Sequence, residues 1–405
     1  MRDVAIIGVG QNKHVAKRRD VNIPELISEA VDNCFAMSGT KPEQVDAVVF
    51  GNMHTFEGVN QPELWAGPML GIVDRPVLRI ATGGTTGATT AAAAYYHVAS
   101  GMADTVLAVA FEKQSDGHAQ MGLVAIALPE GLFMLGFSPS TGVEAMASGG
   151  SAGGAAYQAQ SYMHASGATE EHFAMHVVKN RRNACKNPYA HLQFPNITVE
   201  DVLKTPMISY PIRYGFTCPS SDGACAMLYT TAEKAKKICD QPAFVLGTAS
   251  CSTDPCLNPA GPTLSDPAEQ IACKLAAKWA YERAGIKDPK KEIDLAEIYD
   301  PFAHQEMMWS ERLSLFDEGK GPEMLQKGVT QMDGDLPINA SGGVISTNAI
   351  GATAMIRVGE AALQIMGRAG EHQVPKKVNK TVSHGWGGLF QFVTVTVLSR
   401  EPRKG

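Results

Sequence analysis

The second half of the chain repeats, in the same order, patterns found in the first half. AFVLGTAS (243–250) resembles VAIIGVG (4–10), IDLAEIYDPF (293–302) resembles VDAVVFGNM (45–53), and GATAMIRVGEAALQIMG (351–367) resembles GATTAAAAYYHVASG (87–101). A tandem duplication restricts the possible folds more than any other feature of this sequence. We expect an N-terminal half over 1–242 and a C-terminal half over 243–405, with a functional cleft where equivalent loops of the two halves meet.

Within each half, short apolar runs alternate with stretches of helical periodicity. In the first half we expect strands over 3–9, 45–53 and 105–111, and helices over 23–37 and 85–100. This alternation is typical of α/β proteins and favours a parallel sheet covered by helices on both faces. The pattern loosens between about 115 and 216, which we interpret as an inserted loop domain, with helices over 155–165 and 170–184.

Charge and hydropathy exclude several classes of function. The 405 residues carry a formal net charge of −6 without a block of Lys and Arg, which argues against a nucleic-acid surface. No stretch approaches the roughly 18 apolar residues of a membrane span, and the first residues do not resemble a secretory signal. The eight cysteines include no C-x-x-C pair. We therefore expect a soluble, cytoplasmic protein without disulfides.

The stretch from 79 to 113 is the strongest local candidate for a site. Its Gly/Thr turn, GGTTG (83–87), opens an Ala-rich helix that leads into the strand TVLAVAF (105–111). The unpaired N–H groups and positive dipole end of that helix could face a ligand or a reactive group. Gly/Thr turns also precede buried helices for packing reasons alone. The turn by itself therefore does not distinguish a ligand site from a packing role.

Five motifs, in this order, resemble the thiolase superfamily, most closely its sterol-carrier-type and archaeal branches. They are SGMADTVLAVAFEK (100–113), HFAMHVVKNRRNACKNPYAH (172–191), CPSSDGACA (218–226), YDPF (299–302) and NASGG with GAT (339–343, 351–353). The resemblance covers essentially the whole chain. It implies a thiolase fold, a duplicated five-layer αβαβα arrangement with an inserted loop domain. It also implies a homodimer that acts on acyl-CoA, with CoA as a substrate and no tightly bound cofactor.

The nucleophile of the family is missing. Thiolases carry a reactive Cys in a turn before the buried helix, and a gap-free count back from Glu112 places Gly84 at that position. A shift of register supplies no Cys either. An acyl-cysteine intermediate at this position is therefore impossible, and Gly84 would leave volume for a second thiol or a bulky acyl group.

The family's other three reactive positions are altered as well. Asn348 is expected where the family has an activating His, and an amide can donate to an oxyanion but is no general base. Tyr299 replaces the Asn or His of a third motif, in which Pro301 stands where one branch has a second Cys. His384 lies at or next to the position of the C-terminal acid/base Cys, and its titration range suits proton transfer. Structural roles for His384 and Tyr299 remain open.

The resemblance also suggests groups that bind the substrate. We expect Thr85, Thr86, Ser341, Gly342 and His304 near the acyl-CoA, and Arg181 and Arg182, with Lys179, as cations for a substrate carboxylate. His304 could equally cap a helix. Cys218 and Asp222 match the family and are expected to hold the fold. His172 and His176 lie four residues apart, but without an acidic or third ligand in view we expect no metal site.

Three functions follow from a thiolase without its nucleophile. The chain could cleave a β-ketoacyl-CoA by direct attack of CoA; within the family, the opening residues favour 2-benzoylsuccinyl-CoA, giving benzoyl-CoA and succinyl-CoA in aromatic degradation. It could be a retro-aldol lyase, for which Tyr299 fits but Asn348 stands where a second Tyr is expected. It could also be a non-catalytic scaffold that channels acyl-CoA. Chains of this branch imply a small zinc-ribbon/OB-fold partner subunit, and zinc is expected only there.

Overall fold

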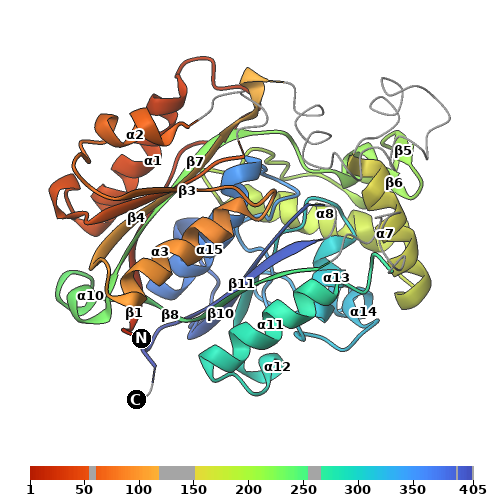
Figure 1. Ribbon diagram of the computed structural model, residues 1–405. Helices are drawn as coiled ribbons and strands as arrows, with labels where there is room; N and C mark the ends of the chain where they lie inside the picture. Colours follow the sequence, from red (N-terminus) through yellow and green to blue (C-terminus); the bar gives the residue numbers. More distant parts are fainter. Residues whose placement is uncertain (54–60, 118–150, 254–265, 389–390, 404–405) are drawn as a thin grey trace.

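The computed structural model describes residues 1–53, 61–117, 151–253, 266–388 and 391–403 (Figure 1). Residues 118–150 of the expected loop domain therefore lie outside the described residues. The strands are β1 (Val4–Gln11), β2 (Ala47–Gly51), β3 (Val77–Ile80), β4 (Thr105–Lys113), β5 (Met207–Ser209), β6 (Ile212–Arg213), β7 (Asp222–Thr231), β8 (Ala243–Ser252), β9 (Leu295–Glu297), β10 (Lys380–Gly387) and β11 (Phe392–Ser399). The α-helices are α1 (Ile23–Ser38), α2 (Glu63–Met69), α3 (Thr86–Ser100), α7 (Ser151–Ser166), α8 (Glu170–Ala184), α9 (Val199–Leu203), α10 (Ala232–Ile238), α11 (Ile271–Ala284), α12 (Pro289–Glu292), α13 (Gln305–Arg312), α14 (Gly321–Gln326) and α15 (Ile350–Met366).

The order of strands in the main sheet reveals the duplication directly. Nine strands follow the order β3-β2-β4-β7-β1-β8-β11-β10-β9. The two halves meet where β1 pairs with β8 through Ala5–Phe244 and Ile6–Ala243. Outward from this junction, β1, β7, β4 and β2 on one side correspond to β8, β11, β10 and β9 on the other. The predicted repeat is confirmed.

The sheet is mixed, so the expectation of a parallel sheet was wrong. β7 runs antiparallel to both β1 and β4, and β11 runs antiparallel to both β8 and β10. Only β2 with β3 and β4, and β9 with β10, are parallel. The pairing of Lys113 with Asp222 gives the reason, because β7 begins beside the end of β4 and has to run back along it.

The helices complete five layers (Figure 1). α3 and α15 lie side by side in the middle and pack against strands of both halves, while α1 covers the outer face of the first half and α11 that of the second. The helices α7 and α8 of the insertion lie beyond one end of these layers. The arrangement is the αβαβα duplication that the family resemblance implies. Among the described residues, no helix is long and apolar enough to cross a bilayer.

Local sequence signals fix the ends of these helices. α1 begins with a capping box between Asn22 and Glu25 and ends at Gly39, which has the left-handed φ of 67° that favours glycine. α3 is rich in Ala and ends at Gly101, whose φ is 91°. All residues of α15 are buried, as expected for a helix enclosed by two sheets. The N-terminal turns of the two central helices lie next to each other, because a Cβ on Gly87 would be 2.9 Å from the Ala352 carbonyl. The candidate site lies beside these turns.

Candidate active site

The Gly/Thr turn connects β3 to the N-terminus of α3 and meets the Gly-rich end of β10. The Thr86 hydroxyl donates to the Gly83 carbonyl at 2.6 Å and accepts from the Thr82 N–H at 2.9 Å, which closes the turn. A Cβ added to Gly387 would lie 2.5 Å from the Gly84 nitrogen. Loops of the two halves therefore converge here, as the duplication predicts.

Gly84 is enclosed rather than open. A Cβ at this position would lie 2.7 Å from the Trp386 carbonyl oxygen and 3.3 Å from the Tyr299 hydroxyl. The first distance is shorter than real Cβ contacts allow, so a side chain would force β10 away. The volume that we expected glycine to leave for an acyl group is instead filled by the backbone of β10 and by Tyr299.

Tyr299 presents a phenol where a thiolase would carry its thiol. The residue follows β9 and is only 2% exposed, and no described residue hydrogen-bonds its hydroxyl. Burial, with a smaller contribution from the nearby Cys218, raises the pKa of Tyr299 well above its ordinary value, so the phenol remains protonated. Its ring packs edge-on against Trp386 with 6.1 Å between the ring centres.

Asn348 lies at the start of α15 and reaches the same site. Its Nδ2 donates to Cys218 Sγ at 3.2 Å, and its Oδ1 accepts from the Thr353 hydroxyl at 3.0 Å. Gln114 donates to its backbone carbonyl at 2.6 Å. The amide is therefore held with its Nδ2 directed toward Cys218, and it can donate to an oxyanion but accept no proton.

His384 lies on the other face of β10. Its ring centre is 4.7 Å from that of Trp309 in α13, and its Nδ1 is 3.4 Å from the backbone N–H of Tyr299. Side chains alternate along a strand, so Gly385 faces α3 and α15 instead, where a Cβ would meet Ala88 and Ala354. Burial lowers the pKa of His384 to about 3. The structure does not bring this imidazole to Gly84.

The two threonines of the turn are buried. Thr86 uses its hydroxyl within the turn, as described above. Thr85 Oγ1 has no described partner and would lie 3.1 Å from a Cβ on Gly385. Both expected substrate residues are thus present at the turn, and only the Thr85 hydroxyl is left without a hydrogen bond.

His304, Ser341 and Gly342 make structural contacts. The Nε2 atom of His304, at the start of α13, lies 2.9 Å from Gln158 Oε1, and burial lowers its pKa to about 3. The Ser341 hydroxyl donates to Glu297 at 2.7 Å. Gly342 has a φ of 101° and packs on Ala184 of α8. His304 and Gly342 therefore link the second half of the chain to helices α7 and α8 of the insertion, and Ser341 binds β9.

The two expected arginines on α8 differ in their surroundings. Arg181 is 8% exposed, lies 5.6 Å from the ring centre of Phe194, and donates to the Gly215 carbonyl at 3.3 Å. No described carboxylate pairs with it, and burial lowers its pKa. Arg182 is more exposed and donates to the Ile197 carbonyl at 2.8 Å. Of these two arginines, Arg181 is the buried one, and no carboxylate in the described part of the chain pairs with it.

Two family models cover most of the chain. Residues 4–201 match the thiolase N-terminal domain and residues 262–400 match the thiolase C-terminal domain-like family. The chain belongs to the thiolase family. An acetyl-CoA acetyltransferase of Methanothermobacter thermautotrophicus is 30% identical over 404 residues, covering 99% of this chain and 100% of the archaeal protein.

Other thiolases and thiolase-like proteins resemble the chain over similar lengths. Benzoylsuccinyl-CoA thiolase subunit BbsB of Thauera aromatica is 27% identical, covering 96% of this chain and 95% of BbsB. The solved structure titled Ltp2-ChsH2(DUF35) aldolase has a TM-score of 0.80 at 24% identity, covering 100% and 99% of the two chains. Human mitochondrial 3-ketoacyl-CoA thiolase in complex with CoA has a TM-score of 0.71, covering 99% and 98%. These structures support the thiolase fold.

A buried charge cluster in this thiolase contains His176, one of the two histidines for which we considered a metal. His176 Nε2 lies 2.8 Å from Asp300 and 3.4 Å from Glu306, two carboxylates that sequence spacing did not reveal. These three residues could hold a metal ion. However, Lys179 also binds Glu306, so two cations already balance two carboxylates. Burial alone would lower the pKa of His176, but Glu306 and Asp300 raise it to about 9.

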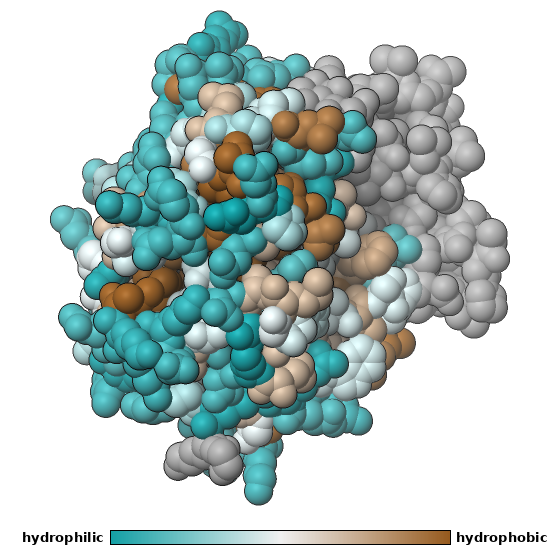
Figure 2. Space-filling model, turned by 60° about the vertical axis from the view of Figure 1, so that its left-hand side comes forward, coloured by the Kyte–Doolittle hydropathy of each residue, from teal (hydrophilic) through white to brown (hydrophobic). Residues whose placement is uncertain are grey.

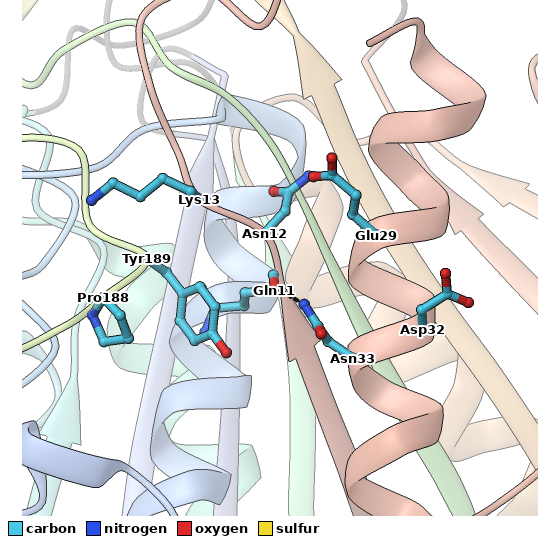
Figure 3. Close-up of a pocket in the computed structure, with 8 residues that line it drawn as sticks. All are labelled: Gln11, Asn12, Lys13, Glu29, Asp32, Asn33, Pro188 and Tyr189. Carbon is cyan, nitrogen blue, oxygen red and sulfur yellow. Dashed lines mark hydrogen bonds between the residues drawn. The ribbon is translucent and has the colours of Figure 1, made fainter. Parts of the chain in front are cut away.

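A surface hollow of about 420 Å³ lies elsewhere, between β1, α1 and the chain after α8 (Figure 3). It is lined by Gln11, Asn12, Lys13, Glu29, Asp32, Asn33, Pro188 and Tyr189. No hydrogen bond or ion pair of the described residues joins this lining to the Gly/Thr turn, and the Asn33 amide already donates to the Gln11 carbonyl at 2.8 Å. The candidate active site is therefore defined by converging side chains and not by this hollow.

Two residues of the site were not expected there. Cys218 was expected to hold the fold, and Trp386, two residues after His384, had no expected role, yet both pack with Tyr299 in one small cluster. The cluster joins segments around 84, 218, 299, 348 and 386. Because these segments are far apart in the sequence, their spacing could not predict that Cys218 and Trp386 contact Tyr299. The CPSSDG motif did mark Cys218 as a position shared with the family.

Proposed function

We propose that this thiolase cleaves a β-ketoacyl-CoA by direct attack of a CoA thiolate on the ketone, without an acyl-cysteine intermediate. The supporting observation is the surroundings of Gly84, where the Trp386 carbonyl and the Tyr299 hydroxyl fill the place of the family's thiol. Since no cysteine can act there, the sulfur must come from CoA itself. Attack forms a tetrahedral oxyanion, and its collapse breaks the C–C bond.

The groups around Gly84 suit this oxyanion. Thr86 N–H donates to the Gly83 carbonyl, so we assign the stabilisation of the oxyanion to the next N–H groups of α3, those of Gly87 and Ala88, and to the protonated Tyr299 hydroxyl. The second N–H of the Asn348 amide remains available beside the one that binds Cys218. We give His384 no direct role, because its ring packs on Trp309.

Arg181 supports a substrate that carries a second acid group. A guanidinium that is buried without an acidic partner is unfavourable unless a ligand supplies the anion. A carboxylate on the acyl chain would do so with two hydrogen bonds. We therefore propose an acidic substrate such as 2-benzoylsuccinyl-CoA, the class of compound named for the Thauera relative, with benzoyl-CoA and succinyl-CoA as products.

A retro-aldol reaction is the second candidate. The Tyr299 hydroxyl, buried and unpaired next to Gly84, could act on the hydroxyl of a β-hydroxyacyl-CoA and release an aldehyde or ketone. This reaction needs no CoA as a nucleophile. The consumption of CoA therefore separates the two functions.

We further propose that two copies associate and that a small zinc-ribbon/OB-fold subunit binds them. β3 is an edge strand of the sheet, and Leu78 on it is 46% exposed, near Leu64 and Met69 of α2 at 69% and 53%. Figure 2 shows that apolar side chains gather in places on one largely hydrophilic face of the molecule. An exposed apolar edge strand is an association site unless it is covered.

The test combines the chain, together with its proposed small partner subunit, with 2-benzoylsuccinyl-CoA in the presence and absence of CoA, and identifies products by mass spectrometry. CoA-dependent formation of benzoyl-CoA and succinyl-CoA is the expected result. Release of an aldehyde or ketone from the matching β-hydroxyacyl-CoA without CoA would favour the lyase. If the chain binds acyl-CoA but transforms neither compound, the channelling scaffold is the remaining function.

A further inference from the structure

The proposed thiolysis leaves one step without a proton donor. When the C–C bond breaks, the departing thioester is an enolate whose α-carbon has to take up a proton. The segment from His384 to Gly387 offers no donor at the turn, because Gly385 and Gly387 face the turn while His384 packs on Trp309. This inference rests on the proposed function and concerns the same site.

Cys218 is the thiol that lies at this site. Its backbone N–H donates to the Pro301 carbonyl at 2.8 Å, which fixes it beside the YDPF segment. Its Sγ accepts from Asn348 Nδ2 at 3.2 Å. It packs against the cluster of Ala88, Tyr299, Val344 and Ala354, and it remains partly exposed. Pro301 stands where one branch of the family has its second Cys, and Cys218 brings a thiol next to that position from another segment.

A second observation indicates that a ligand belongs next to this thiol. Tyr299 packs in the same cluster and is only 2% exposed, and its hydroxyl forms no hydrogen bond with a described residue. A hydroxyl on a buried side chain that has no protein acceptor can donate to a bound molecule that supplies one. An oxygen of the reacting acyl group would accept this hydrogen bond, and Cys218 packs against the cluster that contains Tyr299.

We propose that Cys218 is the catalytic residue that transfers the α-proton. CoA–SH first releases its proton to solvent and attacks as the thiolate. The electron pair of the broken C–C bond passes to the α-carbon, which takes the proton from Cys218 Sγ: an S–H bond breaks and a C–H bond forms. The resulting thiolate takes a proton from water, which its partial exposure permits. One proton is released and one is taken up, so the cycle balances.

The surroundings keep this thiol protonated until the enolate forms. Burial raises the pKa of Cys218 to about 12, while the hydrogen bond from Asn348 acts in the opposite direction. A protonated thiol is a poor nucleophile but a suitable acid toward a carbanion. Cys218 therefore differs in function from the cysteine that is missing at Gly84.

The reverse of this step is measurable without CoA attack. The full-length chain is incubated with succinyl-CoA, and separately with acetyl-CoA, in D2O at alkaline pD, and deuterium at the α-carbon is followed by mass spectrometry. We expect exchange by the natural chain and a loss of about 100-fold or more in Cys218→Ser and Cys218→Ala. Cys185→Ser, a partly exposed cysteine at the end of α8, should stay within twofold.

If the Cys218 variants fold poorly, reversible chemical modification of Cys218 tests the same role in a folded chain. Methylthiolation of Cys218 in the Cys185→Ser chain, located by peptide mapping, should abolish exchange, and dithiothreitol should restore it. Exchange that persists in Cys218→Ser, or after Cys218 is blocked, overturns the role of Cys218 and leaves the proposed thiolysis intact. Exchange by the natural chain without CoA-dependent cleavage overturns the thiolysis alone. A natural chain that does neither overturns both.

Discussion

The two central helices begin with the same residues but in different surroundings. Gly87-Ala88-Thr89 in α3 and Gly351-Ala352-Thr353 in α15 are equivalent in the duplication. At α15, a Cβ on Gly351 would overlap the Glu112 carboxylate, so the chain itself supplies an anion to the N-terminus of this helix. At α3, the turn is lined by threonines, Gly84 and the Tyr299 hydroxyl, and its first turn contains no acidic residue.

The presence of an acidic group at one turn and its absence at the other give the N-terminal turns of α3 and α15 different roles. The charge of Glu112 stabilises the N-terminal N–H groups of α15, as an N-terminal carboxylate does in many helices. In the reaction proposed above, the Gly87 and Ala88 N–H groups of α3 would bind an oxyanion that forms only during the reaction. The α15 turn therefore holds the fold, whereas the α3 turn is the candidate site of chemistry. The predictions below test this contrast.

The largest expected effect concerns the α3 turn. Tyr299→Phe removes a hydroxyl that no described residue binds, so the free energy of unfolding should hardly change. Turnover should fall by about 10²- to 10⁴-fold, because a donor to the oxyanion is lost. Steady-state kinetics and urea denaturation measure the two effects. Tyr281→Phe is the control: its hydroxyl donates to the Leu313 carbonyl at 2.8 Å, so it should lose stability and keep its turnover.

The α15 turn should respond in the opposite way. Glu112→Ala removes the acceptor of the Asn52 amide at 2.7 Å and of the Met53 N–H at 3.1 Å, and it leaves a cavity. We expect a loss of about 3 to 5 kcal/mol in the free energy of unfolding. Glu112→Gln keeps the shape and should lose less. If Glu112→Ala were as stable as the natural chain but inactive, the α15 turn would be catalytic and the contrast would fail.

The contrast extends along the helices and predicts a pH dependence. α3 contains no Asp, Glu, Lys or Arg, whereas α15 buries Arg357 and Glu360. Burial alone would raise the pKa of Glu360, but His372, at 2.7 Å, and Gln11 lower it to about 2. The folded pKa lies below the ordinary value, so the stability from Glu360 is present above pH 4.5 and is lost as pH falls toward 2.

This contribution amounts to about 3 kcal/mol, since one pKa unit corresponds to 1.36 kcal/mol. Urea denaturation at pH 5 and pH 3 should therefore show a smaller difference for Glu360→Gln than for the natural chain. Glu233→Gln, an exposed carboxylate on α10, is the control and should leave the difference nearly unchanged. Equal pH dependence of Glu360→Gln and the natural chain would show that Glu360 is not the group that titrates.

The sequence predicted those features that depend on local patterns. The helix over 170–184 was predicted to the residue, and the duplication followed from repeated apolar runs. The direction of β7 could not be predicted, because it depends on where the chain re-enters the sheet after the insertion. His384 illustrates a related limit: a change of one residue in register moves a side chain to the other face of the strand. Cys218 meets Tyr299 and Asn348 only through tertiary packing.

The smallest expected effect comes from restoring the family's thiol. In Gly84→Cys the new Cβ would lie 2.7 Å from the Trp386 carbonyl, so β10 has to shift, and we expect a loss of about 1 to 3 kcal/mol in stability. No acylation should follow, because Asn348 cannot remove the proton of the new thiol. Intact mass after incubation with acetyl-CoA tests this, with Gly67→Cys on α2 as the control for a new thiol. An acyl group on Gly84→Cys, but not on the control, would mean that the α3 turn still activates a thiol and that only its cysteine is missing.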